Sequence, residues 1–197
     1  MKKKVLYKQY LRFDLLKGNW QVNKPFHKLV ISHKTFNLLE GEVMLTIIMD
    51  LYNQEIFSFY LWNNESILNN SIETLHRLGV NDSPFITTIL HCNREYQYFR
   101  MPFVNLVEKL GYVLSIEDDI ENFDNQLILE FFYDNMIKEM TNNRELTYTK
   151  EGPFVVEDFK KYLRHYNYEK KAYFLKNETP QEYREKRFPN LFQENNF

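Results

Sequence analysis

The sequence contains a single cysteine, Cys92, and no long uninterrupted apolar segment. One cysteine excludes an internal disulfide, and one cysteine with five scattered histidines lacks the ligand spacing of a structural zinc site. No apolar segment approaches the roughly 20 residues that a membrane-spanning helix requires, and charges interrupt the opening residues MKKKVLYKQYLRFDLL. We therefore expect neither a membrane partner nor a secretory signal, and we predict a cytoplasmic protein.

Stretches rich in proline, glycine or serine, which commonly link domains, are also missing from the sequence. A chain of 197 residues, 44% of them hydrophobic, is long enough for one domain with a substantial core. We divide it into a basic N-terminal lead (1–27), a core domain (28–145) and a helical extension of the same domain (146–197).

The net charge of −2 hides an uneven distribution of charged residues. Residues 1–28 hold eight Lys and Arg against one acid, and residues 161–197 hold eight against five acids. The centre of the chain, residues 29–160, therefore has nine basic and twenty-one acidic residues, a net charge of about −12. Affinity for nucleic acids comes largely from Lys and Arg that displace counterions, so this centre repels phosphate and we expect only weak binding to DNA.

The order of predicted elements indicates an α/β fold. Three stretches rich in β-branched and aromatic residues predict consecutive hairpin-connected strands at residues 28–36, 40–50 and 54–62. Two continuous apolar runs predict buried strands at residues 83–90 and 112–116. Apolar periodicity and capping residues predict helices at residues 64–80, 101–111, 124–140 and 155–168. The result is a mixed five-stranded sheet flanked by helices, an order that matches the RNase H-like fold and the start of other mixed α/β folds.

Five blocks of the sequence carry a more specific signal: LLKGNWQVNKPFHKLVISHKTF, LTIIMDLYNQEIFSFYL, ILHCNREYQY, DNQLILEFF and HYNYEKKAYFLKNETPQEYR. In order and spacing they resemble the integrase core of insertion-sequence transposases, the bacterial two-reading-frame family with a DDE catalytic domain. The resemblance runs from about residue 14 to residue 184. It implies an RNase H-like, integrase-core domain at 28–145 and a bacterial protein of the DNA transposition and integration class.

The resemblance also implies where catalytic carboxylates belong. Active members of the family hold two Mg²⁺ ions between two Asp and one Glu, and these ions assist an in-line phosphoryl transfer. The family's first strand carries a "TD" pair and its fourth strand ends in "HSD". At these places the present sequence has Ile31-Ser32 and His91-Cys92-Asn93, so Ser32 and Asn93 replace both aspartates.

The third carboxylate position has two candidates, Leu129 and Glu130. Aligning Asp124-Asn125 and Phe131-Phe132 with the family places Leu129 at the Glu position, whereas a shift of one residue would place Glu130 there. One residue rotates a helical side chain by about 100°, so we expect Glu130 to face solvent or to lie behind the site. We take Ser32, Asn93 and Glu130 as positional remnants of the triad, with Leu129 as the alternative third position.

Mg²⁺ prefers charged oxygen ligands, which Ser, Asn and Leu do not supply. We therefore expect no metal and no cofactor here, and predict a transposase-like protein that has lost strand transfer. Two alternatives stay open. One is an active metal-dependent strand transferase or nuclease that uses a rearranged site of Asp50, Glu130 and Asp124. The other is a regulator that binds DNA, an intact transposase or a second copy of itself as a homodimer.

Several further residues have a functional and a plainer interpretation. Arg164, Lys170 and Lys171 lie where relatives place basic residues near DNA, and an ordinary solvated helix end explains them equally well. Asp50 suits a turn or cap better than catalysis. His91 beside Cys92 suggests a nucleophile, but neighbouring strand residues point to opposite faces, so a buried, inert cysteine is favoured. Three aromatics are predicted to be core or packing residues: Trp20, Tyr96 and Tyr98.

Overall fold

A five-stranded mixed sheet in the order β3-β2-β1-β4-β5 forms the centre of the computed structural model, which describes residues 14–39, 41–62, 66–81, 87–118, 127–147 and 153–189. The strands are β1 (Lys28–Leu38), β2 (Gly41–Asp50), β3 (Ile56–Trp62), β4 (Ile89–Cys92) and β5 (Val113–Ile116). β1, β2 and β3 pair antiparallel, and β4 pairs parallel with both β1 and β5. The predicted mixed five-stranded sheet is confirmed.

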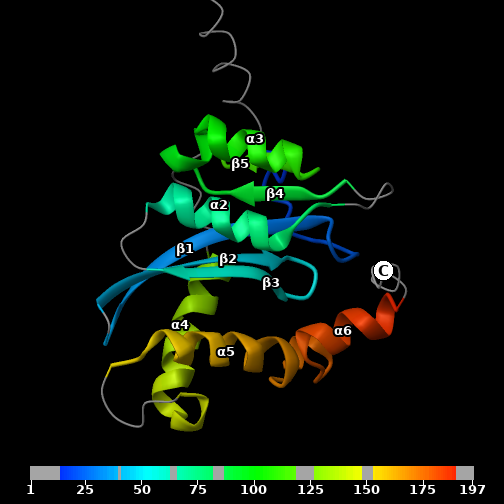
Figure 1. The fold of residues 1–197 in the computed structure, drawn as a ribbon. Helices are drawn as coiled ribbons and strands as arrows, with labels where there is room; N and C mark the ends of the chain where they lie inside the picture. Colours follow the sequence, from blue (N-terminus) through cyan, green and yellow to red (C-terminus); the bar gives the residue numbers. More distant parts are fainter. Residues whose placement is uncertain are drawn as a thin grey trace, which may run out of the picture.

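Helices cover both faces of this sheet (Figure 1). One layer contains α2 (Ile67–Leu78) and α3 (Met101–Lys109), and the other contains α4 (Leu127–Asn142) and α5 (Val156–Tyr168). α6 (Pro180–Arg187) continues beyond α5, and short 3-10 helices lie at η1 (Tyr96–Phe99), η3 (Arg144–Leu146) and η4 (Tyr173–Leu175). Within the ranges given above, no helix has the length and apolar character needed to cross a membrane.

Each face of the sheet has its own hydrophobic core, because side chains alternate along the strands. On β1, Leu29 and Ile31 belong to the core beneath α2 and α3, whereas Val30 belongs to the core beneath α4 and α5. Burying one such aliphatic side chain stabilises a fold by about 1.5–3 kcal/mol. The same alternation turns the even-numbered residues of β1, including Ser32 and Lys34, toward α4.

The predicted end signals of α2 act as expected. The Ser66 side chain accepts a hydrogen bond from the Asn69 backbone N–H, and Gly79 ends the helix with φ of 85°. β4 differs from its prediction, because its ladder covers only residues 89–92. Its neighbour β5 begins only after the turn at Gly111, whose φ is 82°. β4 therefore pairs with a strand on each side over only four residues. Residues 83–86 of the predicted strand lie outside the described ranges.

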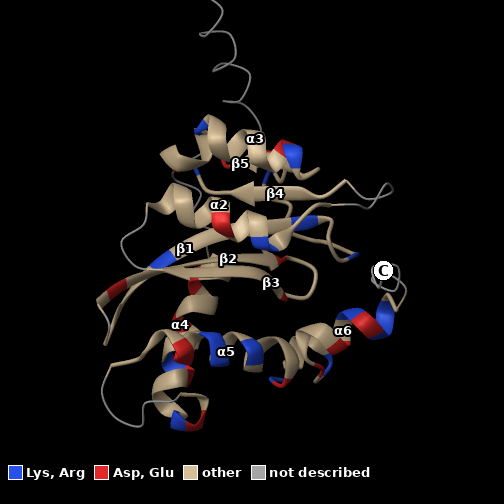
Figure 2. Cartoon of the chain, viewed as in Figure 1, with Lys and Arg blue, Asp and Glu red and all other residues tan. Residues whose placement is uncertain are grey.

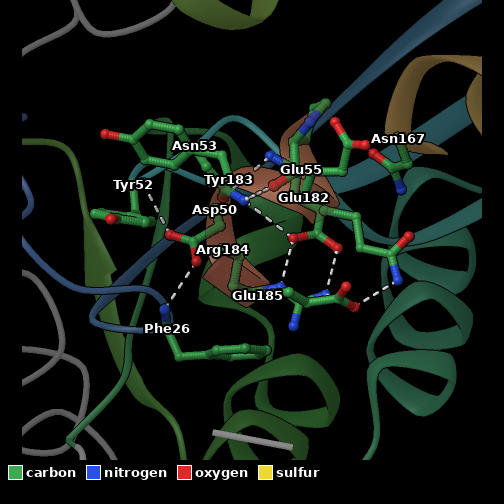
Figure 3. Close-up of polar contacts among 12 residues, drawn as sticks. Phe26, Asp50, Tyr52, Asn53, Glu55, Asn167, Glu182, Tyr183, Arg184 and Glu185 are labelled. Carbon is green, nitrogen blue, oxygen red and sulfur yellow. Dashed lines mark hydrogen bonds and ion pairs between the residues drawn. The ribbon is translucent and has the colours of Figure 1, made fainter. Parts of the chain in front are cut away.

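A buried polar network attaches the C-terminal helices to the β2–β3 hairpin (Figure 3). Arg184 of α6 donates two hydrogen bonds to Glu55, at 2.7 and 3.0 Å, and both side chains are almost fully buried. Asn53 donates to Glu55 and to the Pro180 carbonyl. The Asn167 side chain accepts from the Ile56 N–H and donates to the Ile56 carbonyl. The helical extension thus docks through hydrogen bonds that leave few polar groups unpaired.

Candidate functional site

A small cavity of about 20 Å³ lies where β1, β4, β5 and α4 meet. The strand alternation described above brings Ser32 of β1 together with His91 and Asn93, at the end of β4, on the α4 side of the sheet. The remaining lining residues come from the chain before β1, from the strands and from α4: Trp20, Val30, Ile31, Cys92, Glu117 and Leu129. A cavity of this size accommodates about one water molecule or one small ion.

Of the two candidates for the third position, Leu129 lines the cavity and Glu130 does not. Leu129 is 5% exposed and lines the cavity. The Glu130 side chain is 47% exposed and turns toward Lys34, whose Nζ donates to Glu130 Oε2 at 3.0 Å and to Asp134 Oδ1 at 2.8 Å. Burial lowers the pKa of Lys34, but its bonds to Asp134 and Glu130 outweigh burial and raise it. Lys34 is therefore a permanent cation beside Glu130.

The orientation of the Asn93 side chain follows from its neighbour Glu95. Asn93 Nδ2 donates to Glu95 Oε1 at 2.5 Å, so the amide oxygen Oδ1 points the other way. Reversing the amide would set two oxygens against each other, which is unfavourable. Among the residues that the structure describes, buried Oδ1 has no hydrogen-bond partner. Asn93 therefore presents an unsatisfied oxygen where the sequence resemblance expects a carboxylate.

His91 is a second unsatisfied group at the cavity. Its Nδ1 lies 2.9 Å from Ser115 Oγ and 3.9 Å from Asp14 Oδ1, and its ring packs edge-on against Trp20 with 5.4 Å between ring centres. Burial lowers the pKa of His91 to about 4, although Asp14 acts in the opposite direction, so the imidazole is neutral at pH 7. Its Nε2 is buried and has no partner in the described part of the chain.

Cys92 points to the opposite face of the sheet from His91 and belongs to the core beneath α2 and α3. Its Sγ lies 3.5 Å from the Ser115 carbonyl, and burial raises the pKa of the thiol well above its ordinary value. A thiol that stays protonated is a poor nucleophile. The geometry thus gives no support to a His91–Cys92 nucleophile.

The acids of the proposed rearranged site do not come together. Asp50 pairs with Leu29 at the start of β1, and its carboxylate accepts the backbone N–H groups of Phe26 and Tyr52. Glu130 instead contacts Lys34, which lies five residues further along β1, or about 16 Å at the usual rise of a strand. Asp124 lies outside the described residues. Asp50 therefore acts as a turn cap in the polar network (Figure 3).

The basic residues near the C-terminus differ in exposure and in whether they form an ion pair. Arg164 and Lys171 are exposed, and no ion pair is found for either in the described ranges. Lys170 is half-buried and its Nζ bonds to Glu139. Figure 2 shows acidic and basic residues close together on α4 and α6, and basic residues along α5.

Two of the three aromatics predicted to be core or packing residues, Trp20 and Tyr98, are packed as expected. Tyr98 is fully buried, and Trp20 packs against the core beneath α4 and α5. Tyr96 is 70% exposed with the Arg100 guanidinium over its ring, so its prediction as a core aromatic is wrong. Tyr96 lies in the 3-10 helix η1, so the strand pattern of alternating buried and exposed side chains does not apply to it.

Comparison with known proteins gives the fold a family context. No model of a protein family matches the chain. The InsK protein of insertion sequence element IS150 from Escherichia coli strain K12, named as a transposase, is 23% identical over 171 residues. This match covers 87% of the chain and 59% of InsK, so the chain spans about three fifths of the length of that relative.

Solved structures show the same architecture. The HTLV-2 integrase catalytic core domain, in complex with magnesium and in a trimeric form, has a TM-score of 0.60 at 12% identity, over 83% of this chain and 99% of that chain. The BIV integrase catalytic core domain has a TM-score of 0.57 at 13% identity, over 80% of this chain and 92% of that chain. This chain has the RNase H-like fold of an integrase catalytic core. The resemblance inferred from the sequence is confirmed, together with weak homology to an insertion-sequence transposase.

The side chains at this cavity do not fit a pair of magnesium ions. Two such ions need several charged oxygens in near-octahedral arrangements, whereas Ser32, Asn93 and Leu129 supply a hydroxyl, an amide and a hydrocarbon at the cavity. Glu117 is the one carboxylate that lines the cavity as described. No group of three or more His, Cys, Asp and Glu is placed to hold a metal in the described part of the chain.

Sequence reasoning missed the residues that shape this site. Lys34, Glu95 and Ser115 determine how Glu130, Asn93 and His91 are oriented. One signal was available: Lys34 lies two residues after Ser32, so on a strand both side chains must face α4. The contacts of Glu95 and Ser115 depend on the loop after β4 and on the β4–β5 register, which local sequence does not reveal.

Proposed function

We propose that this chain is an integrase-core protein of the DNA transposition class that does not catalyse strand transfer and acts by binding. A single observation carries the proposal. Ser32, Asn93 and buried Leu129 line the cavity at the three positions where the resemblance expects metal-binding carboxylates. Without those charges, the ligand set is too poor in anionic oxygen to bind two magnesium ions at millimolar concentration.

The position of Glu130 supports the same proposal. An active site could be rebuilt only if this carboxylate turned through about 100° around α4, which would break its bonds to Lys34. The rotation would also withdraw Leu129 from a core that includes Phe132 and Tyr133. Losing a buried leucine typically costs 2–5 kcal/mol.

We propose that the retained fold binds a second copy of itself or an intact transposase. The HTLV-2 integrase core is known in dimeric and trimeric forms, so this architecture supports self-association in that protein. Weak contact with DNA through Arg164 and Lys171 is the secondary part of the proposal, because both cations are exposed.

The decisive experiment compares the wild-type chain with the triple variant Ser32→Asp/Asn93→Asp/Leu129→Glu. Both proteins are incubated with supercoiled plasmid DNA and with labelled duplex in Mg²⁺ and in Mn²⁺. The wild type is expected to show no nicking or strand transfer above Ser32→Ala/Asn93→Ala, which serves as the contamination control. The triple variant is expected to gain metal-dependent thermal stabilisation whether or not it cuts DNA.

A wild-type nicking activity that requires Mg²⁺ and disappears in Ser32→Ala/Asn93→Ala would overturn the proposal. The binding half is tested separately, by size-exclusion chromatography with light scattering and by mixing the tag-free chain with a purified active homologue. A chain that stays monomeric and recovers no homologue would contradict it.

A further inference from the structure

A pocket of about 230 Å³ lies between α4, α5 and η4, apart from the cavity at Ser32 and Asn93. Its floor consists of buried aromatic rings. Phe132 packs edge-on against Tyr166 with 5.0 Å between ring centres, and Tyr162 stacks beside Tyr166. An apolar cavity of about 150 Å³ holds one benzene molecule. The pocket therefore accommodates one ring-sized group, such as an aromatic side chain.

Two of the phenylalanines that line this pocket are exposed to solvent. Phe131 of α4 is 63% exposed and Phe174 of η4 is 57% exposed. Tyr173, the neighbour of Phe174, is 90% exposed. Exposed aromatic rings that adjoin a pocket are typical of a surface that binds another molecule. We call Phe131, Tyr173 and Phe174 the aromatic patch.

The loop at residues 172–178 fixes the part of the aromatic patch that η4 contributes. The Ala172 N–H donates to the Glu178 carbonyl at 3.0 Å, so the two ends of the loop are paired. Leu175, near its centre, is buried. Lys176 has a left-handed backbone with φ of 57°, a conformation that is uncommon for residues other than glycine and persists where the surroundings fix it. Binding to a fixed loop avoids the entropy cost of ordering a flexible one.

The free charges beside the aromatic patch are positive. Lys171 and Lys176 are exposed, and neither forms an ion pair within the described part of the chain. The two acids of residues 169–178, Glu169 and Glu178, instead bond to basic side chains of this chain. Complementary charges favour association and like charges oppose it. The patch therefore favours a ligand with negative charge.

We propose that the aromatic patch and its pocket bind an acidic segment of a partner protein. One aromatic side chain of that segment occupies the pocket, and its carboxylates lie near Lys171 and Lys176. This inference rests on the binding role proposed above and deepens it by naming the surface and the class of partner.

A single strand of nucleic acid also suits aromatic rings and lysines, but it fits this surface less well. Such a strand carries a phosphate on every nucleotide and binds along a positively charged groove. Acidic and basic residues lie close together on α4 and α6, the helices that border the patch (Figure 2). The acids would repel a continuous row of phosphates, whereas a peptide has its carboxylates at only some positions.

The test is fluorescence anisotropy with a short labelled peptide in which one phenylalanine is flanked by glutamates. We expect saturable binding to the wild-type chain. Replacing the phenylalanine of the peptide by alanine should weaken binding about tenfold or more, because no ring then enters the pocket. Replacing its glutamates by lysines should also weaken binding, because like charges then meet at the patch.

Two variants of the chain test the pocket itself. Asn135 is exposed on α4 and lines the pocket, so Asn135→Trp should obstruct it without unfolding the chain. This variant and Phe131→Ala should each weaken peptide binding about tenfold or more. The matched control is Tyr96→Ala, which removes an exposed aromatic ring in η1 and should bind the peptide like the wild type.

A second pair of variants tests the charges. Lys171→Glu/Lys176→Glu should weaken binding of the glutamate peptide about tenfold or more and make the remaining binding less sensitive to salt. Lys24→Glu/Lys109→Glu changes the net charge by the same amount at two exposed lysines outside the patch. This control pair should bind the peptide like the wild type.

The absence of saturable peptide binding, or binding that survives in both Phe131→Ala and Asn135→Trp, would overturn the proposal. Binding of single-stranded oligothymidylate that Asn135→Trp abolishes, with no binding of the peptide, would assign the patch to nucleic acid instead. These failures are distinct from failure of the proposed function. Metal-dependent nicking by the chain overturns that function whatever the peptide does, and self-association without peptide binding overturns only this inference.

Discussion

Lys34 of β1 and Glu130 of α4 form an ion pair with 3.0 Å between Nζ and Oε2, and this pair holds the Glu130 carboxylate outside the cavity that Leu129 lines. A cation of the protein itself therefore neutralises Glu130. The pair explains how a glutamate can lie one residue from the expected catalytic position without taking part in the site.

Replacing Lys34 by methionine should have a small effect on stability. Glu130 is about half exposed and Asp134 more so, and exposed pairs contribute roughly 0.2–1 kcal/mol. We expect Lys34→Met to lower the free energy of unfolding by no more than about 1 kcal/mol, and Lys34→Arg to lie closer to the wild type. Urea unfolding measures both, and a loss above 3 kcal/mol would show that the pair is structurally essential.

Exchanging residue types at positions 129 and 130 should give opposite results. Leu129→Glu places a carboxylate in the core and should destabilise the fold by about 3 kcal/mol or more. Glu130→Leu, the matched control on the exposed side of α4, should change stability by less than about 1 kcal/mol. Chemical denaturation of the two variants decides the register of this helix, and equal losses would contradict the placement of Leu129 in the cavity.

Removing Arg184 should strongly destabilise the chain, because it leaves the buried Glu55 carboxylate without its bidentate partner. The expected loss for Arg184→Met is about 3–5 kcal/mol, whereas Lys186→Met on the exposed side of α6 should cost less than about 1 kcal/mol. The double variant Glu55→Gln/Arg184→Met should recover part of the loss, since it removes the uncompensated charge. If the double variant is no more stable than Arg184→Met, the charge is not the cause.

Asp50 and His91 should give stability opposite dependences on pH. Burial raises the pKa of Asp50 from 3.8 to about 7, although its bonds from Tyr52 and Phe26 oppose the rise. Folded protein then holds a proton that the unfolded chain has lost, so Asp50 lowers stability as pH rises from about 4 to 7. Burial lowers the pKa of His91 from 6.5 to about 4. Between these two pH values the histidine is protonated in the unfolded chain and neutral in the folded protein. Its contribution to stability therefore increases as the pH rises from 4 to 6.5.

These two contributions partly cancel in the wild type, and Asp50→Asn should separate them. Relative to the wild type, the stability of Asp50→Asn should rise with pH between 4 and 6.5, on the order of 3 kcal/mol over that range. Urea unfolding at three pH values in this window measures the change. Parallel curves for variant and wild type would show that Asp50 has no raised pKa.

Arg164→Ala/Lys171→Ala should weaken duplex DNA binding equally for unrelated DNA sequences, because phosphate contacts carry no sequence information. The matched control is Lys24→Ala/Lys109→Ala, which removes two exposed cations away from α5. Fluorescence anisotropy at 50 mM salt should show weaker binding and a shallower salt dependence for the first pair. Equal effects of the two pairs would assign binding to overall charge.

The succession of strands and helices along the chain and the α2 caps could be predicted because they depend on local patterns: β-branched runs, Ser66 at a helix start and Gly79 at its end. The α6 helix was predicted only as part of a helical extension, although a capping box of Thr179 and Glu182, with Pro180 at the first helical position, marks its start. Its docking through Arg184 and Glu55, 129 residues apart, is not visible in sequence. Tyr96 was misassigned because the chain leaves the strand alternation after Cys92.

The residues at the site could be predicted from the sequence, but the directions in which their side chains point could not. Ser32 and Asn93 could be placed because their strands have an alternating pattern and a family resemblance. The choice between Leu129 and Glu130 required the rotation of α4, which depends on packing of Phe132 and Tyr133 against the sheet. The unsatisfied atoms of His91 and Asn93 follow from Ser115 and Glu95, whose positions only the folded chain defines.

The two hydrogen bonds between the Asn167 side chain and the backbone of Ile56 have a consequence for assembly. β3 is an outer strand of the sheet, and such strands invite sheet extension by another chain. The Asn167 amide occupies the donor and acceptor of Ile56 as a neighbouring strand would. The backbone of Ile56 is thereby unavailable to a strand of another chain, so the sheet cannot be extended at the start of β3.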